Sequence, residues 1–268
     1  MKVSAAGFLA LILVSSVRGE DAVPGHPVDD SAYETDRPGE VENPFAVPPG
    51  QAELVNYVVG ANAAAREDLF GRGGAAVFTD TAVRFGVATR LEGLVSIDSF
   101  LRTNPSDDNE GGSNAGFGYA TLLAKWNFLK DPAGDFGLAV APFVRLPLDR
   151  SIGGSAQSTA GLVVPFDFDL EGGWELEGST SVARTPEGSA KWSTPWENQA
   201  SLQRNLTTAV AAYVELQLES GDGPAAWATE FGVTCRLNRS LLIDLGCSLG
   251  IGQNSHGRMG YAGLGWHF

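Results

Sequence analysis

From Gln51 to the C-terminus, apolar and polar residues alternate in segments of about ten residues, separated by turn-forming residues. A period of two places successive side chains on opposite faces of a β-strand, and a long series of such segments is typical of a membrane barrel. The segments are 51–61, 76–89, 93–102, 116–129, 136–147, 159–170, 174–185, 196–203, 208–219, 225–237, 241–252 and 259–268. We therefore predict an all-β fold, a transmembrane antiparallel up-and-down β-barrel of about 12 strands.

The two faces of these segments differ in charge. In the segment at 241–251, Ile243, Leu245 and Cys247 share one face, while Asp244 and Ser248 share the other. A soluble β-sandwich or a lipocalin-like barrel is the alternative, but its charged face points outward and its apolar face inward. The faces rich in Leu, Val and Phe carry almost no charge here, as exposure to lipid requires.

The lengths of the connections predict the topology. Connections at 90–92, 130–135, 171–173, 204–207 and 238–240 are mostly short, and those at 62–75, 103–115, 148–158, 186–195, 220–224 and 253–258 are mostly long. Outer-membrane barrels have short periplasmic turns and longer outer loops. An even number of strands then places both termini in the periplasm.

Aromatic residues gather at the ends of the segments that are expected to be periplasmic. Rings prefer the membrane interface, whereas a sandwich core would not sort them by strand end. The predicted girdle consists of Trp126, Phe128, Phe136, Phe166, Phe168, Trp174, Trp266 and Phe268. Phe268 is also the last residue of an alternating strand, which resembles the signal that the barrel-assembly machinery of the outer membrane reads.

The first 50 residues differ from the rest. Lys2, the apolar run 5–17 and Val17-Arg18-Gly19 fit a signal peptide over 1–19, which predicts export. Residues 20–50 are rich in proline and acids and show no strand or helix period, so they form an extended segment ahead of the barrel at 51–268. This segment is either a periplasmic tail or a plug, whose Asp36 and Arg37 would pair with charges in the lumen.

Thr35-Asp36-Arg37-Pro38 and the stretch from Asn43 to Gly50, which ends in Val-Pro-Pro-Gly, precede the first strand. This opening resembles that of the outer-membrane barrel transporters named for the meta-pathway of phenol degradation. The turns near 89–91 and 236–240 are also similar to periplasmic turns of that family. The resemblance implies an outer-membrane location and a transport role, and the family name does not establish an aromatic substrate.

The inward face carries most of the charge, because a charged side chain facing lipid at mid-depth costs roughly 2–4 kcal/mol. The lumen-lining candidates are Arg84, Asp98, Lys125, Arg145, Asp167, Asp169, Glu175, Glu177, Tyr213, Glu215, Glu230, Arg236 and Asp244. They line either a pore or an interior filled by paired charges. Acidic residues outnumber basic ones among them, which favours cations or neutral solutes over anions.

Other functions are disfavoured by the composition. The formal net charge of −14 offers no basic patch for nucleic acid, and we find no spacing typical of a metal or cofactor site. Ser255 and His256 are the most suggestive catalytic pair, but adjacent side chains diverge on an extended backbone, so we predict no enzyme. Cys235 and Cys247 are expected roughly 13 Å apart along neighbouring strands and therefore remain free thiols.

Two function classes remain. The first is passive or facilitated transport of small solutes, hydrophobic or aromatic ones included, through a polar, net acidic lumen. The second is a barrel that does not transport and acts as an adhesin, scaffold or interaction protein through its outer loops. Transport is preferred, because adhesion barrels usually need longer loops.

Overall fold

The computed structural model describes residues 42–62, 76–103, 114–130, 136–148, 157–187, 191–221, 223–252 and 258–268. The predicted signal peptide, the plug candidates Asp36 and Arg37, and the Ser255–His256 pair lie outside these residues. Twelve long strands occur in the described chain: β1 (Ala52–Asn62), β2 (Ala76–Ala88), β3 (Leu91–Thr103), β5 (Tyr119–Lys130), β6 (Phe136–Pro147), β7 (Thr159–Leu170), β8 (Trp174–Glu187), β10 (Trp196–Asn205), β11 (Val210–Ser220), β12 (Ala226–Asn238), β13 (Leu241–Ile251) and β14 (Arg258–His267). Two short strands, β4 (Asn114–Gly116) and β9 (Lys191–Ser193), pair antiparallel with the ends of β3 and β8.

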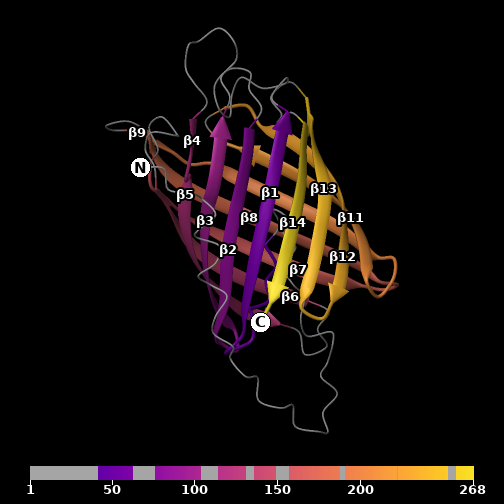
Figure 1. Cartoon of the computed structure of the whole chain (residues 1–268). Coiled ribbons are helices and arrows are strands. Elements are labelled where there is room, and N and C mark those ends of the chain that lie inside the picture. Colours follow the sequence, from indigo (N-terminus) through magenta and orange to yellow (C-terminus); the bar gives the residue numbers. More distant parts are fainter. Residues whose placement is uncertain are drawn as a thin grey trace, which may run out of the picture. The chain divides into compact units, whose positions relative to one another are not determined.

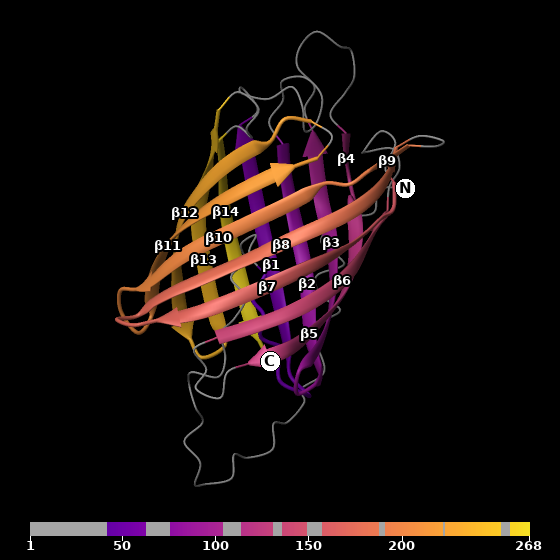
Figure 2. The same cartoon turned by 180° about the vertical axis from the view of Figure 1, so that it is seen from behind.

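The twelve long strands form a closed antiparallel barrel (Figures 1 and 2). Each long strand pairs with its neighbours in the chain, β8 pairs with β10, and β14 pairs with β1 to close the sheet. Closure leaves no long strand with an unpaired edge, which the hydrocarbon of a membrane requires. The prediction of an up-and-down barrel of about 12 strands is confirmed.

Burial alternates along the strands in the sense opposite to that of a soluble protein. In β13, Leu242, Asp244 and Ser248 are buried, whereas Leu245 and Leu249 are 57% and 38% exposed. The large exposed side chains are therefore apolar and the buried ones are largely polar or charged. No helix in the described ranges is long and apolar enough to cross a membrane.

The connections at one end of the barrel are tight. β2 joins β3 through Thr89 and Arg90, and β7 joins β8 through a turn in which Gly172 and Gly173 have φ of 80° and 74°, a region that glycine adopts without strain. The prediction of a turn over 90–92 was wrong by two residues, because β3 already begins at Leu91. The amide nitrogens and carbonyl oxygens of Ala52 and Phe268 exchange two hydrogen bonds of 3.0 Å at this same end.

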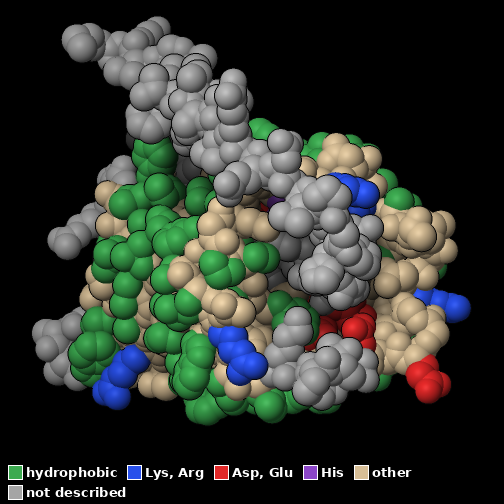
Figure 3. All heavy atoms as spheres, turned by 90° about the horizontal axis from the view of Figure 1, so that it is seen from below, with side chains coloured by type: hydrophobic (Ala, Val, Ile, Leu, Met, Phe, Trp, Pro, Cys, Tyr) green, Lys and Arg blue, Asp and Glu red, His purple; other side chains and the backbone are tan. Residues whose placement is uncertain are grey.

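The predicted girdle lies at this end, which we call the short-turn end. Trp126, Phe128, Phe168, Trp174, Trp266 and Phe268 are exposed, and Phe136 and Phe166 are partly exposed. Neighbouring rings contact one another, with ring centroids 4.5 Å apart for Phe136 and Phe168. Figure 3 looks toward the short-turn end and shows hydrophobic side chains over the outer wall and acidic side chains inside the rim. That this end faces the periplasm stays a prediction.

Candidate functional site: the inner wall of the barrel

One side of the inner wall carries a row of carboxylates. Asp167 of β7 lies in register with Glu177 of β8, and Glu215 of β11 lies in register with Glu230 of β12. Ser201 of β10 joins the two pairs, since it is the register partner of both Glu177 and Glu215. All five side chains are buried, and each points to the interior. We call this set the carboxylate row.

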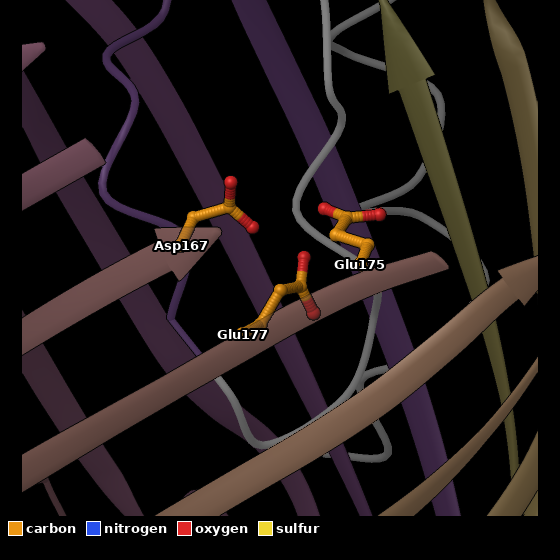
Figure 4. A group of neighbouring side chains, drawn as sticks. All are labelled: Asp167, Glu175 and Glu177. Atoms are coloured by element: carbon orange, nitrogen blue, oxygen red, sulfur yellow. The ribbon is translucent and has the colours of Figure 1, made fainter. Parts of the chain in front are cut away.

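Glu175 enlarges the row at the short-turn end. Carboxylate oxygens of Asp167, Glu175 and Glu177 all lie within 4.8 Å of one another, and the three side chains converge inside the barrel (Figure 4). Glu175 also accepts a hydrogen bond of 2.7 Å from the Nε2 of Gln203. Three carboxylates at this spacing match the oxygen ligands that hard cations prefer, so these are the side chains that could hold a metal ion.

Amide side chains continue the polar wall from the carboxylate row toward the long-loop end. Glu197 of β10 accepts hydrogen bonds from the Nε2 atoms of Gln199 and Gln217, at 3.0 and 2.7 Å. Ser179 of β8 donates to the side-chain oxygen of Gln199 at 3.2 Å. Gln199 and Ser179 were not predicted from the sequence, because neutral side chains in a period-two pattern do not stand out from surface residues.

A tyrosine cluster occupies the wall of β11 to β14. Tyr213 and Tyr261 are separated in register by Gly232 and Gly246, whose lack of a side chain leaves room for both rings. The two hydroxyls are hydrogen-bonded to each other, and that of Tyr213 also donates to Asp244 at 3.0 Å. Tyr213 and Asp244, predicted as lumen residues, therefore form part of a filled and buried wall.

The segment Asn43–Pro49, which we call the strap, lies against the opposite inner wall. Lys125 Nζ of β5 donates to the carbonyl oxygen of Asn43 at 2.8 Å. The Nδ2 of Asn127, on the same strand, donates to the carbonyl oxygen of Pro44 at 2.9 Å. Val47 is buried, and its amide donates to Glu92 Oε2 at 2.8 Å. Three strap residues are thus bound by inward-facing side chains of β3 and β5.

A charge network lies beneath the strap. Glu92 of β3 is 2.8 Å from Arg84 of β2 and 3.5 Å from Lys125. Arg84 also lies 3.6 Å from Glu42, which precedes the strap. Burial raises the pKa of the Glu42 carboxyl above its ordinary value, and the positive charge of Lys125 opposes this. Glu92 joins both bases to the strap, and this role was not predicted, because the sequence places Glu92 in an expected turn.

The predicted lumen residues do not form one site. Asp98 and Arg145 pair at 3.0 Å toward the long-loop end, and the guanidinium of Arg145 lies 4.3 Å from the ring centre of Tyr119. Asp169 and Arg236 share the inward register but are exposed near the short-turn end. That these side chains contact a solute stays a prediction.

The closed barrel with an apolar outside and a charged inside defines the class of the protein, an outer-membrane type β-barrel. The chain belongs to the family described as "Putative MetA-pathway of phenol degradation", whose sequence profile matches residues 35–268. This confirms the resemblance drawn from the opening residues. No curated protein matches the chain.

Solved structures share the fold. The COG4313 outer membrane channel from Pseudomonas putida F1 superposes with a TM-score of 0.63 and 13% identity, over 85% of this chain and 100% of that chain. The NanC porin gives a TM-score of 0.53 and 7% identity, over 80% of this chain and 97% of that chain. The KdgM porin in complex with disordered oligogalacturonate gives 0.51 and 7%, over 80% and 99%. These structures are described as channels and porins, and the likeness shows that they share the barrel fold of this chain.

Proposed function

We propose that this protein is an outer-membrane channel through which small solutes diffuse. The observation that carries the proposal is the inverted barrel: charged side chains such as Asp167, Glu177 and Glu230 are buried inside, while large apolar side chains cover the outside. A buried charge is costly unless it is paired or used, and the inside of a membrane barrel is where charge can act on a solute.

The charge of the inner wall favours cations or neutral solutes. The carboxylate row, Glu175 and Asp244 occupy one side of the barrel, whereas Arg84 and Lys125, which would offset them, are already bound to Glu92. Fixed negative charge in a confined interior attracts cations and repels anions. The KdgM porin is described with oligogalacturonate, a polyanion. The acidic wall of this barrel is instead suited to cations or neutral solutes.

Export and assembly complete the proposal. The signal peptide over residues 1–19 directs the chain across the inner membrane, and the C-terminal strand ending in Phe268 is recognised by the barrel-assembly machinery. The lipid bilayer of the outer membrane then surrounds the apolar face. Residues 20–50 form the N-terminal segment ahead of the barrel, and the strap is part of it.

Conductance of the refolded mature chain in a planar bilayer, under a potassium chloride gradient, tests the proposal. We expect discrete steps and a reversal potential that shows a preference for potassium over chloride. The double variant Asp167→Asn/Glu177→Gln should keep the steps and lose part of that preference, since it removes two carboxylates without changing side-chain size. Leu216→Met on the outer face is the matched control and should behave as the wild type.

A folded barrel that is silent in every bilayer would contradict the channel. The alternative, a barrel that acts as an adhesin or scaffold through its outer loops, would then be favoured. Conductance steps whose ion preference is the same in the double variant and the wild type would support a channel. They would contradict the proposal that these two carboxylates face the solute.

A further inference from the structure

The strap lies at the short-turn end of the barrel, at the level of the carboxylate row. Pro49, the last residue of the strap, forms a bridge with Gly86 of β2, so this end of the strap touches the inner wall. The ring of Phe45 lies so close to Gly137 of β6 that a Cβ there would be 2.7 Å from it. Gly137 is in turn the register partner of Asp167. The strap therefore runs from β2 across β3 and β5 to the edge of the acidic side.

The strap covers the basic part of the wall at this level. Lys125 is fully buried and donates to the strap at Asn43, and Arg84 is 3% exposed. Glu92 binds both bases through one oxygen and the strap amide of Val47 through the other. The strap thus accepts one hydrogen bond from Lys125 directly and is joined to Arg84 through Glu92, and both bases are buried beside it.

Positive and negative side chains are therefore present at one level of the barrel. The bases lie beneath the strap, and only the carboxylates lie on the side that the strap leaves uncovered. If the strap were absent, Arg84 and Lys125 would still lie beside Glu92, but the net positive charge of these three side chains would face the lumen opposite the carboxylate row and partly cancel its field. The position of the strap decides which field a permeating ion meets.

We propose that the strap Asn43–Pro49 is the charge-selectivity element of the channel, which rests on the channel function proposed above. Docked, it covers Arg84 and Lys125 and leaves the acidic side to set a preference for cations. Undocked, it uncovers both bases, so that conductance rises and the cation preference falls. This change in conductance and ion preference requires no substitution of a charged residue.

Gly86 offers a way to displace the strap and keep every charge. A Cβ at Gly86 would overlap the carbonyl groups of Pro48 and Val47, so Gly86→Ala places a methyl group where the strap backbone lies. Gly265→Ala is the matched control: it also faces the interior, but its Cβ would meet nothing nearer than 3.4 Å. Deletion of residues 43–48 is a second variant that removes the strap and retains both bases.

The position of the strap can be read independently of transport. Val47 is 7% exposed when the strap is docked, so a Val47→Cys thiol should react slowly with a water-soluble maleimide. The reporter is built in a Cys235→Ala/Cys247→Ala background, which removes the other thiols. With Gly86→Ala added, we expect labelling at least about tenfold faster, since reaction then follows the undocked population.

Reversal potentials under a potassium chloride gradient and single-channel conductance are measured on the same proteins. The proposal expects Gly86→Ala and the deletion variant to conduct more and to prefer potassium less than the wild type and Gly265→Ala. Slow labelling in Gly86→Ala would overturn the docking described here. Fast labelling with unchanged selectivity would overturn the selectivity role alone, whereas silence of every variant and of the wild type would instead refute the channel.

Discussion

Lys125 supports the clearest prediction on stability. Its side chain is fully buried, donates to the carbonyl oxygen of Asn43 at 2.8 Å and lies 3.5 Å from Glu92. Lys125→Met keeps an unbranched side chain and removes the charge and the donors. The buried Asn43 carbonyl then loses its lysine donor, and a buried polar group left unsatisfied costs about 1–3 kcal/mol.

The loss should be smaller than that of a fully broken buried ion pair, which costs about 3–5 kcal/mol. Glu92 retains Arg84 at 2.8 Å and the Val47 amide at 2.8 Å, so its charge stays compensated. We expect the free energy of unfolding to fall by about 2–3 kcal/mol.

The assay is urea unfolding and refolding in lipid vesicles, followed by the fluorescence of the six tryptophans. Arg145→Met is the matched control, because it breaks a 3.0 Å pair with Asp98 whose arginine is 45% exposed. An exposed pair contributes at most about 1 kcal/mol, so this control should change little. Equal losses in the two variants would refute the reasoning that burial of the Lys125 contacts sets their contribution.

Three further predictions concern the outside of the barrel and its closure. Leu245→Arg, in the middle of β13 on the outer face, should lower the free energy of unfolding by about 2–4 kcal/mol, whereas Leu237→Arg, near a strand end, should lower it by at most about 1 kcal/mol. Unfolding in lipid vesicles measures both, and equal losses would contradict a membrane centred on the middle of β13. Cys235 and Cys247 are free, and since Cys247 lies four residues beyond the register partner of Cys235, both thiols should react in denatured, unreduced protein. Phe268→Ser should lower the fraction of the chain assembled in cells several-fold, while the free energy of unfolding of the refolded variant falls by only about 1 kcal/mol. Assembly equal to that of the wild type would contradict a role of Phe268 as an assembly signal.

The strands could be predicted because each face of a barrel strand meets a different environment. Lipid on one side and a charged interior on the other impose a period of two, and the segment predicted at 241–252 is observed as β13, Leu241–Ile251. The inward direction of Lys125, Asp167 and Glu230 followed from the same period. These are local signals, which a single segment carries in full.

The partners of those residues could not be predicted, because they lie far away in the sequence. Lys125 binds a backbone carbonyl 82 residues earlier, and a carbonyl leaves no mark on residue type. Prolines at 44, 48 and 49 indicated an extended segment, but its place inside the barrel follows from contacts such as those with Glu92 and Asn127. Glu92 itself looked like a turn residue, since nothing near it shows that Arg84 and Lys125 meet there.

The carboxylate row leads to a last prediction, in which stability and selectivity change in opposite directions. Glu215 and Glu230 lie directly opposite each other on neighbouring strands, an arrangement that destabilises a sheet, whereas Glu92 and Lys125 occupy the same relation with opposite charges. A wall arranged for stability alone would pair opposite charges everywhere. Glu230→Gln should therefore raise the free energy of unfolding by about 0.5 kcal/mol and lower the preference for potassium over chloride. A variant that loses stability and keeps its selectivity would show that the row serves structure, and the acidic field would then have no part in transport.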